Sequence, residues 1–470
     1  MAEILPVSPP TDSFSASARP DFMGHPRGLW ILVLTEAWVA FSLYGMQAIL
    51  VLYLTYSLLT PEHVAHVWGY GALHHFVSFL YAPSGRQATA GAITGLFLAG
   101  IYAMPLFGGF LADRVLGQTR TILLGAVLMT AGHILLSFDW SFVIALGLLL
   151  LGIGAAGGLR AQVGALYAVD DRRRSDAYQI YMLGIQAAVI VSPLLCGALA
   201  QVAWHWGFLA AGLGMLIGLV IYAAGRHWLP SENIAARKVS VPRPALTRTE
   251  KKTCALLLFL IPVLAIAALP NEEIFDGYLL WGQQHYALTL LGYPFPVSAL
   301  LSLDGFISTI TAVAVLGFWK VYARYRPDVS EITKVAIGTF IASFSPLLLA
   351  LGSWITPQPH QLSLLWGIAF HTVNDIGFAM NYAIGMALFS RAAPKSVNTI
   401  MVACFSLHLF LANLIVGKFS TLLGHVSDAT FWFLHSGAAL GASVVLGFCA
   451  MIFRPLLAPE TSVSAPSQGE

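Results

Sequence analysis

Long apolar segments alternate with short polar joints, the loops that connect them, along almost the whole chain. An apolar helix needs about 20 residues to cross a lipid bilayer. Twelve segments reach that length, at residues 28–56, 90–112, 119–138, 141–168, 177–201, 204–226, 253–286, 293–323, 331–353, 361–391, 396–424 and 428–455. The pattern therefore predicts an all-α membrane protein with twelve transmembrane helices.

The positive charges fall on one side of these segments. All but three of the 24 Lys and Arg residues lie in every second joint or in the polar ends of the chain, the exceptions being Arg86, Arg160 and Lys418. Lys and Arg are retained on the cytoplasmic side during membrane insertion. The alternation predicts that both termini are cytoplasmic and that the long joint at 57–89 lies outside.

A basic joint that contains prolines, residues 227–252, divides the chain into two halves of six segments each. We expect an N-terminal six-helix bundle at 28–226, a cytoplasmic linker at 227–252 and a C-terminal six-helix bundle at 253–455. The polar stretches 1–27 and 456–470 are expected to be disordered cytoplasmic tails, because they offer few apolar groups to bury.

The composition agrees with a membrane protein and argues against other classes. The chain is 57% hydrophobic and 10% charged, with a mean hydropathy of +0.76, whereas a soluble protein is about 25% charged. The net charge of +2 is spread along one membrane face, so no nucleic-acid partner is expected. The four cysteines lie in apolar segments without metal-ligand spacing, and we expect neither a metal nor a cofactor.

The joint at 57–89 contains four histidines, at positions 63, 66, 74 and 75. They are compatible with a metal site, or with a polar external loop or short surface helix. We favour the second interpretation.

The joint between the second and third segments reads GGFLADRVLGQTR, residues 108–120. It resembles the G-x-L-a-D-r-x-G-r-[KR] loop of the major facilitator superfamily, with Gly109, Asp113, Arg114, Gly117 and Arg120 in register. Glycines permit a tight turn at the membrane edge. The resemblance implies twelve transmembrane helices in two six-helix bundles, and it makes these five residues a candidate conformational motif.

Within that superfamily the chain resembles the proton-dependent oligopeptide transporters of bacteria. The resemblance rests on the loop above, on LGIG followed by VGALY at 151–167, on DDRRRSDAYQIYMLGIQAAVIVSPLLCG at 170–197, and on TEAWVAFSLYG at 35–45. The last stretch is a degraded E-x-x-E-R-F-x-Y-Y-G motif. In the second half, NEEIFDGYLLWGQQH at 271–285 is the best match.

Several positions depart from the family pattern. Val39 and Ala40 replace the second acid and the Arg of the first motif, although Glu36, Phe41 and Tyr44 match it. Gln186 stands where the family has Asn, and Phe378 stands where it has the Glu of the peptide-amine clamp. The resemblance therefore implies the family's architecture for this chain more strongly than it implies the family's peptide substrate.

Charged residues inside a membrane are costly and usually functional. Glu36 and Arg160 lie at similar depths on segments that are neighbours in the superfamily fold. We expect them to form a pair, which acts either as a coupling pair that exchanges partners or as a static buried pair.

A second group of acids, Glu272, Glu273, Asp276 and Asp304, falls towards the outer half of segments seven and eight. Residues 272 and 276 share a helix face, as do 273 and 276. Neighbouring carboxylates cannot both ionise cheaply in a low dielectric, so the group is a candidate proton site. The alternative is that Glu272 and Glu273 lie at the wet outer end of the segment.

The candidate substrate-binding residues are polar or aromatic side chains expected to line a central cavity. They are Glu36, Tyr44, Arg160, Gln186, Tyr278, Trp281, Asn374, Asp375 and Phe378. Asp375 lies near the middle of the tenth segment. It lies three positions before Phe378, almost one helical turn away.

The resemblance, together with the charged residues inside the segments, implies a secondary active transporter that couples protons to the symport of short peptides or peptide-like zwitterions by alternating access. We expect a monomer in the inner membrane of a bacterium, with the substrate, protons and membrane lipid as partners. The alternative is a transporter of a non-peptide solute, drug-like or sugar-like, that need not be proton-coupled. An enzyme is not expected, because the chain has no G-x-S-x-G, H-E-x-x-H or Walker pattern.

Overall fold

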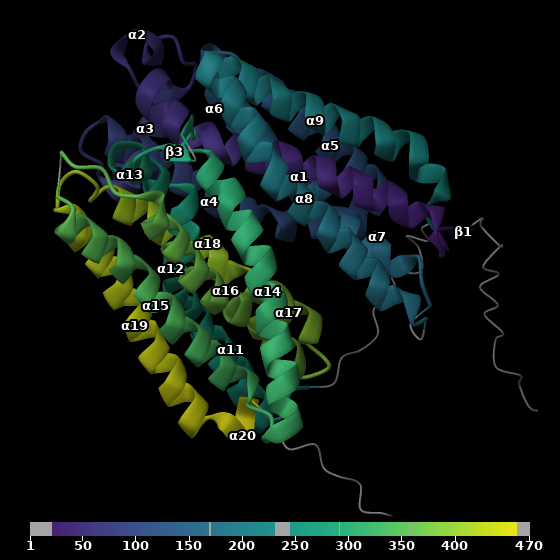
Figure 1. The fold of residues 1–470 in the computed structure, drawn as a ribbon. Coiled ribbons are helices and arrows are strands. Elements are labelled where there is room, and N and C mark those ends of the chain that lie inside the picture. Colours follow the sequence, from purple (N-terminus) through teal and green to yellow (C-terminus); the bar gives the residue numbers. More distant parts are fainter. Residues whose placement is uncertain (1–20, 169–170, 231–244, 291, 358, 458–470) are drawn as a thin grey trace, which may run out of the picture.

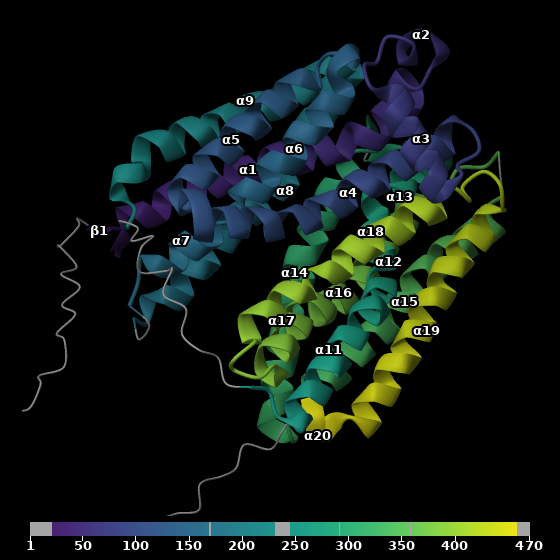
Figure 2. The same cartoon turned by 180° about the vertical axis from the view of Figure 1, so that it is seen from behind.

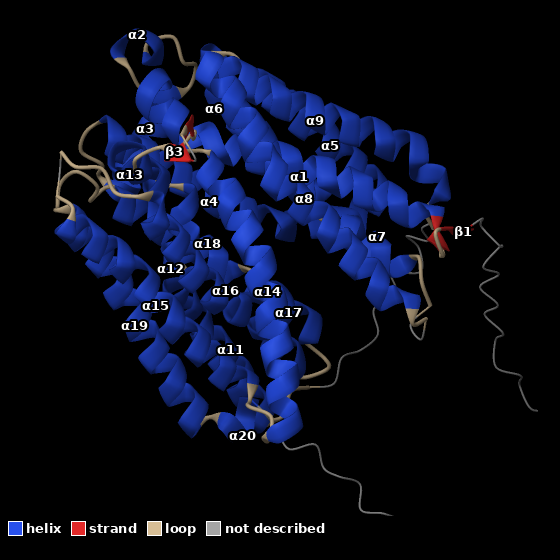
Figure 3. Cartoon of the chain, in the orientation of Figure 1, coloured by secondary structure: helices blue, strands red, loops and turns tan. Residues whose placement is uncertain are grey.

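The computed structural model describes residues 21–168, 171–230, 245–290, 292–357 and 359–457. Their regular structure is almost entirely helical, with two short hairpins (Figure 3). A transmembrane segment has no water to satisfy its backbone N–H and C=O groups. The long apolar segments therefore fold as helices, in which each backbone group is bonded within the segment.

The N-terminal half begins with a hairpin of two-residue strands, β1 and β2. Its elements are β1 (Asp21–Phe22), β2 (His25–Pro26), α1 (Arg27–Tyr53), η1 (Leu54–Leu58), α2 (Pro61–Val64), α3 (Tyr70–Tyr81), α4 (Arg86–Leu111), η2 (Ala112–Leu116), α5 (Gln118–Leu135), η3 (Asp139–Ser141), α6 (Phe142–Ala156), α7 (Leu159–Ala165), α8 (Arg173–Val202), α9 (Trp204–Gly225) and η4 (Arg226–Trp228).

The C-terminal half contains a second hairpin, β3 with β4, between its first two long helical segments. Its elements are α11 (Arg248–Ala267), α12 (Leu269–Glu272), η5 (Glu273–Phe275), α13 (Gly277–His285), β3 (Thr289–Leu290), β4 (Tyr293–Pro294), α14 (Ala299–Tyr325), α15 (Glu331–Ile355), α16 (Leu364–Ala392), α17 (Asn398–Phe405), α18 (Leu407–Ser420), α19 (Asp428–Ile452) and α20 (Arg454–Leu457).

In the described residues, nine helical spans are long and apolar enough to cross a membrane, and the bent pair of α11 with α12–η5 makes a tenth. The two remaining predicted segments are α5 and α16, which pack among these spans. Each of the twelve predicted segments therefore coincides with a helix or a broken helix. The prediction of an all-α protein with twelve transmembrane helices is confirmed.

The helices form two groups that lie close together at one end and diverge at the other (Figures 1 and 2). We call the end that carries α3, α13 and β3 the closed end, and the end that carries α7, α17 and α20 the open end. The groups contact each other through α4 with α18, α8 with α14 and α1 with α13.

The apolar cores follow the same division. At the closed end a single core contains side chains from both halves of the chain, for example Phe97 and Leu149 together with Trp281 and Trp432. At the open end each half has a separate core. Among the described residues, shared burial of apolar surface therefore holds the halves together mainly towards the closed end. A small cluster that includes Ala412 adds a contact with Tyr102 of α4.

The N-terminal stretch differs from its prediction where it is described. Residues 21–26 form a hairpin instead of a disordered tail, and the His25 Nδ1 atom lies 2.8 Å from the Tyr167 hydroxyl, which fixes the hairpin to the N-terminal half. The predicted disorder of residues 1–20 and 458–470, and most of the predicted linker, at 231–244, lies outside the described residues.

Candidate functional site

Two glycine-lined helices form the contact between the halves at the closed end. A Cβ atom added to Gly95 of α4 would lie 2.5 Å from the Gly417 Cα atom of α18 and 2.9 Å from the Asn413 carbonyl oxygen. One added to Gly91 would lie 2.5 Å from the Ser420 Cβ atom. Small residues let helix backbones approach this closely in a membrane. The contact therefore depends on glycine.

The acidic residues of the seventh segment lie where that helix is broken. Pro270 stands at the start of α12, and the chain bends by 48° between α11 and the following turns. A proline removes one backbone N–H donor and clashes with the preceding turn. The break places Glu272, Glu273 and Asp276 on short turns instead of on one continuous helix face.

Glu273 forms a fully buried pair with His435 of α19. The His435 Nε2 atom lies 2.9 Å from the Glu273 Oε2 atom, and both side chains are inaccessible to solvent. The His435 Nδ1 atom lies 2.9 Å from the Phe431 carbonyl oxygen, which only accepts hydrogen bonds, so Nδ1 carries a hydrogen. The imidazole of His435 therefore links the Glu273 carboxyl directly to the backbone of α19.

The two neighbouring acids have different surroundings. Glu272 accepts a hydrogen bond of 2.7 Å from the Asn413 amide of α18, and it also interacts with Tyr102 of α4 in the other half. Asp276 is fully buried, and within the described part of the chain neither of its carboxyl oxygens makes a hydrogen bond of good geometry. The Ser420 hydroxyl is close enough to interact with it.

Asp304 lies on α14 and has its close partners on α16. Its Oδ1 atom lies 2.8 Å from the Nδ1 atom of His371, and the His371 Nε2 atom lies 3.0 Å from the Tyr278 hydroxyl. Asp304 also interacts with the Asp375 carboxyl one helical turn after His371. Asp375 is buried, and its Oδ1 atom accepts a hydrogen bond of 3.3 Å from the Asn374 amide.

The four acids lie within electrostatic reach of one another, since the Asp304 charge acts on Glu272 and the Glu273 charge acts on Asp276, but their close partners differ. Asp304 interacts with Asp375 and His371, while Glu273 and Asp276 lie near Ser420. The alternative of a wet outer end is wrong for Glu272 and Glu273, whose residues are 2% and 0% exposed. Helix periodicity does not hold between Glu272 and Asp276, because the turn Glu273–Phe275 is a 3-10 turn and the Asp276 backbone is not helical.

Glu36 and Arg160 are neighbours, and each also interacts with a tyrosine hydroxyl. The Glu36 carboxylate interacts with the Tyr181 hydroxyl of α8 and is attracted by the Arg160 guanidinium of α7. Arg160 is solvent-exposed and also interacts with the Tyr382 hydroxyl of α16, in the other half. Arg160 therefore stands between the halves, on the side towards the open end.

The remaining predicted binding residues fall into two groups. Gln186 and Tyr44 lie between the halves. The Gln186 amide donates a hydrogen bond of 2.8 Å to Thr309, and the Tyr44 ring centroid lies 6.1 Å from that of Phe275. Tyr278 and Trp281 are fully buried in an aromatic cluster in this conformation, so their role in substrate binding stays a prediction.

Two further candidates lie on α16. The Asn374 amide donates a hydrogen bond of 3.1 Å to Asn271, beside the helix break. The Phe378 ring stacks on the Tyr382 ring, with centroids 5.6 Å apart. Phe378 is therefore next to the tyrosine that Arg160 contacts.

The candidate conformational motif forms the turn from α4 to α5. Gly117 has a φ of 81°, and its carbonyl accepts a hydrogen bond of 2.7 Å from the Thr121 hydroxyl. A left-handed φ is the conformation that favours glycine. Asp113, Arg114 and Arg120 are exposed on this turn. The role of these residues in conformational change stays a prediction.

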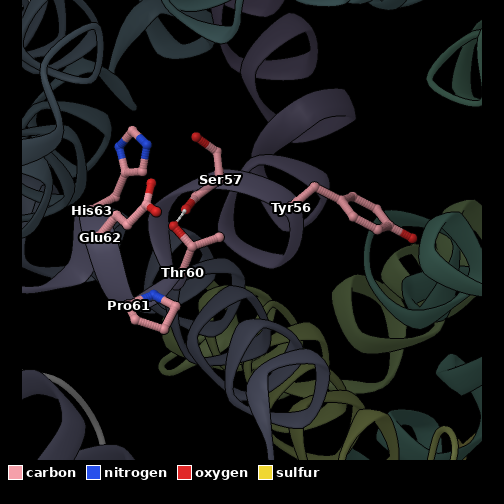
Figure 4. A pocket seen from close by; sticks show the side chains of 6 residues that line it. All are labelled: Tyr56, Ser57, Thr60, Pro61, Glu62 and His63. Atoms are coloured by element: carbon pink, nitrogen blue, oxygen red, sulfur yellow. Dashed lines mark hydrogen bonds between the residues drawn. The ribbon is translucent and has the colours of Figure 1, made fainter.

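The histidine-rich joint folds into the surface helices α2 and α3. A polar pocket of about 340 Å³ lies beside α2, lined by Tyr56, Ser57, Thr60, Pro61, Glu62 and His63 (Figure 4). His63 contacts Asp139. No group of three or more His, Cys, Asp or Glu side chains with metal-binding geometry occurs in the described ranges. The interpretation as surface helices fits this joint.

Sequence reasoning missed both buried histidines of the site. His371 lies one helical turn before Asp375, a spacing that places both on one face and was a usable signal. His435 lies on α19, more than 150 residues from Glu273, and the sequence offers no signal for that pairing.

Residues 84–417 match the family model described as the Major Facilitator Superfamily. A di-/tripeptide transporter of Lactococcus lactis subsp. cremoris is 39% identical, over 93% of this chain and 97% of the relative. The fold is similar to that of a mutant peptide transporter POT in complex with alafosfalin, with a TM-score of 0.78, 22% identity, and coverage of 94% of this chain and 97% of that one.

A second solved structure, a POT family transporter in complex with 5-aminolevulinic acid, has a TM-score of 0.75 and 21% identity, and covers 92% of this chain and 98% of that one. The related proteins are transporters, which confirms the expectation of an integral membrane transporter that is not an enzyme. The chain therefore belongs to the major facilitator superfamily and, within it, to the proton-dependent oligopeptide transporter family.

Proposed function

We propose that this protein is a proton-coupled symporter of di- and tripeptides and peptide-like zwitterions. It would work by alternating access as a monomer in the inner membrane of a bacterium, with both termini cytoplasmic. The names of the relatives support the substrate class. The observation that carries proton coupling is the group of buried carboxyl groups at the broken helix beside the contact between the halves.

In this proposal the closed end faces outwards and the open end faces the cytoplasm. Glu273, Asp276 and Glu272 are then sealed from the outside by the contact of α4 with α18. A bare charge inside the membrane costs several kcal/mol, so these groups stay buried only while protons or hydrogen bonds compensate them. Separation of the halves at the closed end would admit water and let these groups exchange protons with the outside.

The substrate would bind between two groups of opposite charge. The Asp304 and Asp375 carboxyls share their environment with His371 and form the acidic side, which suits a substrate amine. Arg160 is exposed between the halves and suits a substrate carboxylate. When the substrate leaves, Glu36 would replace the substrate carboxylate as the partner of Arg160. The site would be lined by Tyr44, Gln186, Asn374 and Phe378.

The non-peptide alternative keeps one specific observation in its favour. Phe378 occupies the position of the family's amine-binding acid and stacks on Tyr382 instead of offering a carboxylate. An apolar group at this point would suit a solute that lacks a peptide amino terminus. The two candidate functions, transport of peptides and transport of a non-peptide solute, differ in whether Asp375, one helical turn from Phe378, binds a substrate amine.

Uptake into proteoliposomes tests the proposed function. The purified protein would be offered a mixed library of dipeptides, amino acids and sugars, with and without an imposed inward proton gradient. We expect accumulation of dipeptides above the external concentration only when the gradient is present. Equal uptake with and without the gradient would refute proton coupling, and selective uptake of sugars would refute the substrate class.

A matched variant pair locates the amine site. Asp375→Asn should weaken uptake of dipeptides and leave uptake of their des-amino analogues unchanged. Ser353→Ala, on the neighbouring helix α15, serves as the control because, among the described residues, the Ser353 hydroxyl donates to the Leu349 carbonyl of its own helix.

A further inference from the structure

The surface helix α3 has one apolar face that is already occupied. Val77 and Tyr81 are buried, and Tyr70 and Leu73 pack against the shared core of the closed end. These positions are spaced by three and four residues, which places them on one side of a helix. This face therefore binds α3 to the rest of the protein.

A second apolar face of α3 is exposed. Phe79 is 83% exposed, Phe76 is 52% exposed and Leu80 is 45% exposed. At 3.6 residues per turn the three side chains lie within one arc of the helix, beside the buried face. His74 and Ser78 lie on the opposite side. The helix is thus amphipathic, and the described parts of the protein cover only a part of its apolar surface.

The start of α3 is fixed at the end of a membrane-spanning helix. The backbone N–H of Trp68 donates a hydrogen bond of 3.0 Å to the carbonyl of Trp140, just before α6, and the two indole rings lie 4.9 Å apart. Both indoles are exposed, at 63% and 40%. Exposed tryptophans at the ends of transmembrane helices gather at the level of the lipid headgroups.

The other end of α3 is fixed to the C-terminal half. The Lys418 ammonium of α18 donates a hydrogen bond of 2.7 Å to the Tyr81 carbonyl, at the last residue of α3. A cation is favourable at a helix C-terminus, where carbonyl groups lack partners. Both views show α3 beside α4 at the closed end (Figures 1 and 2). The helix therefore spans from one half to the other at the depth that the tryptophans mark.

We propose that α3 is an interfacial helix whose exposed face of Phe76, Phe79 and Leu80 binds the phospholipid of the leaflet at the closed end. Its apolar face would enter the upper acyl chains, with His74 and Ser78 turned to water, as amphipathic helices do at membrane surfaces. Continuity with the exposed tryptophan pair selects lipid as the occupant over a second protein chain. The proposal does not depend on the transported substrate.

Spin-label accessibility tests this assignment. Nitroxides would be attached to single cysteines at Phe76→Cys, Phe79→Cys and His74→Cys, in a background without the four native cysteines. Phe448→Cys on the spanning helix α19, where Phe448 is 57% exposed, serves as the lipid reference. The labelled protein would be reconstituted in vesicles of phosphatidylethanolamine and phosphatidylglycerol, and collision rates measured with oxygen and with a water-soluble nickel chelate.

Oxygen concentrates in the acyl chains, whereas the nickel chelate stays in water. We expect labels at 76 and 79 to resemble the label at 448, with frequent oxygen and rare nickel collisions, and the label at 74 to show the reverse. Nickel collisions at 76 and 79 equal to those at 74 would overturn the proposal. Immobilised labels protected from both reagents would also overturn it, because they would indicate a protein partner. Gel filtration and thermal melting confirm that each labelled variant is folded.

Discussion

Gly95→Ala is the sharpest perturbation of the proposed alternating access. Its added methyl group would lie 2.5 Å from the Gly417 Cα atom and 2.6 Å from the Gly417 nitrogen. Both are backbone atoms, so no side chain can rotate away. The two helices must separate before the alanine fits.

The size of the effect follows from these distances. Ordinary van der Waals contact begins near 3.4 Å, so the helices must move apart by about 0.9 Å. Extra methyl groups forced into a well-packed contact cost about 1–3 kcal/mol. If the cost falls only on the conformation with a closed outer end, the equilibrium between the two conformations shifts by about 5- to 150-fold towards the open outer end.

Distances between pairs of spin labels measure this shift. One pair, Ser84→Cys with His425→Cys, reports on the closed end, and a second pair, Ser175→Cys with Lys395→Cys, reports on the open end. All four positions are exposed. With Gly95→Ala we expect a longer component in the first distance distribution and a shorter one in the second.

Gly147→Ala on α6 is the matched control, because an added Cβ atom at Gly147 meets no atom within 4 Å. Both substitutions raise helix propensity equally, by about 1 kcal/mol. Distance distributions that do not change with Gly95→Ala, in a variant that melts like the wild type, would refute the assignment of this contact as a gate.

Three further outcomes are expected. Glu273→Gln should abolish accumulation driven by a proton gradient but preserve counterflow exchange, which moves no net protons; retained accumulation in a transport assay would place coupling elsewhere. Asp375→Asn should raise the Michaelis constant for amine-bearing substrates by about 10- to 100-fold, the worth of a buried charged hydrogen bond; an equal loss for des-amino analogues would make Asp375 structural. Arg160→Ala should lower the melting temperature more than the double variant Glu36→Gln/Arg160→Ala, since the single change leaves Glu36 uncompensated; strictly additive melting shifts would show that the two residues do not interact.

The transmembrane architecture was readable from the sequence because its signals are local. Each segment is identified by a run of about 20 predominantly apolar residues. No contact with a distant part of the chain is needed to make such a segment helical in a bilayer. The same holds for the turn that contains Gly117, whose residue types match a tight connection. The candidate residues Glu36 and Arg160 were found in the same way, since a charge within an apolar run is conspicuous.

The partners of those charges were decided only by the tertiary structure. Glu273 meets His435, and Asp304 meets His371, across sequence separations that no periodicity links. The turn Glu273–Phe275 and the non-helical backbone of Asp276 give Glu272 and Asp276 different environments, although a continuous helix would have placed them on one face. A sequence specifies which groups a segment must bury, whereas helix packing decides which neighbour compensates each one, because compensation depends on distances of a few ångströms between separate helices.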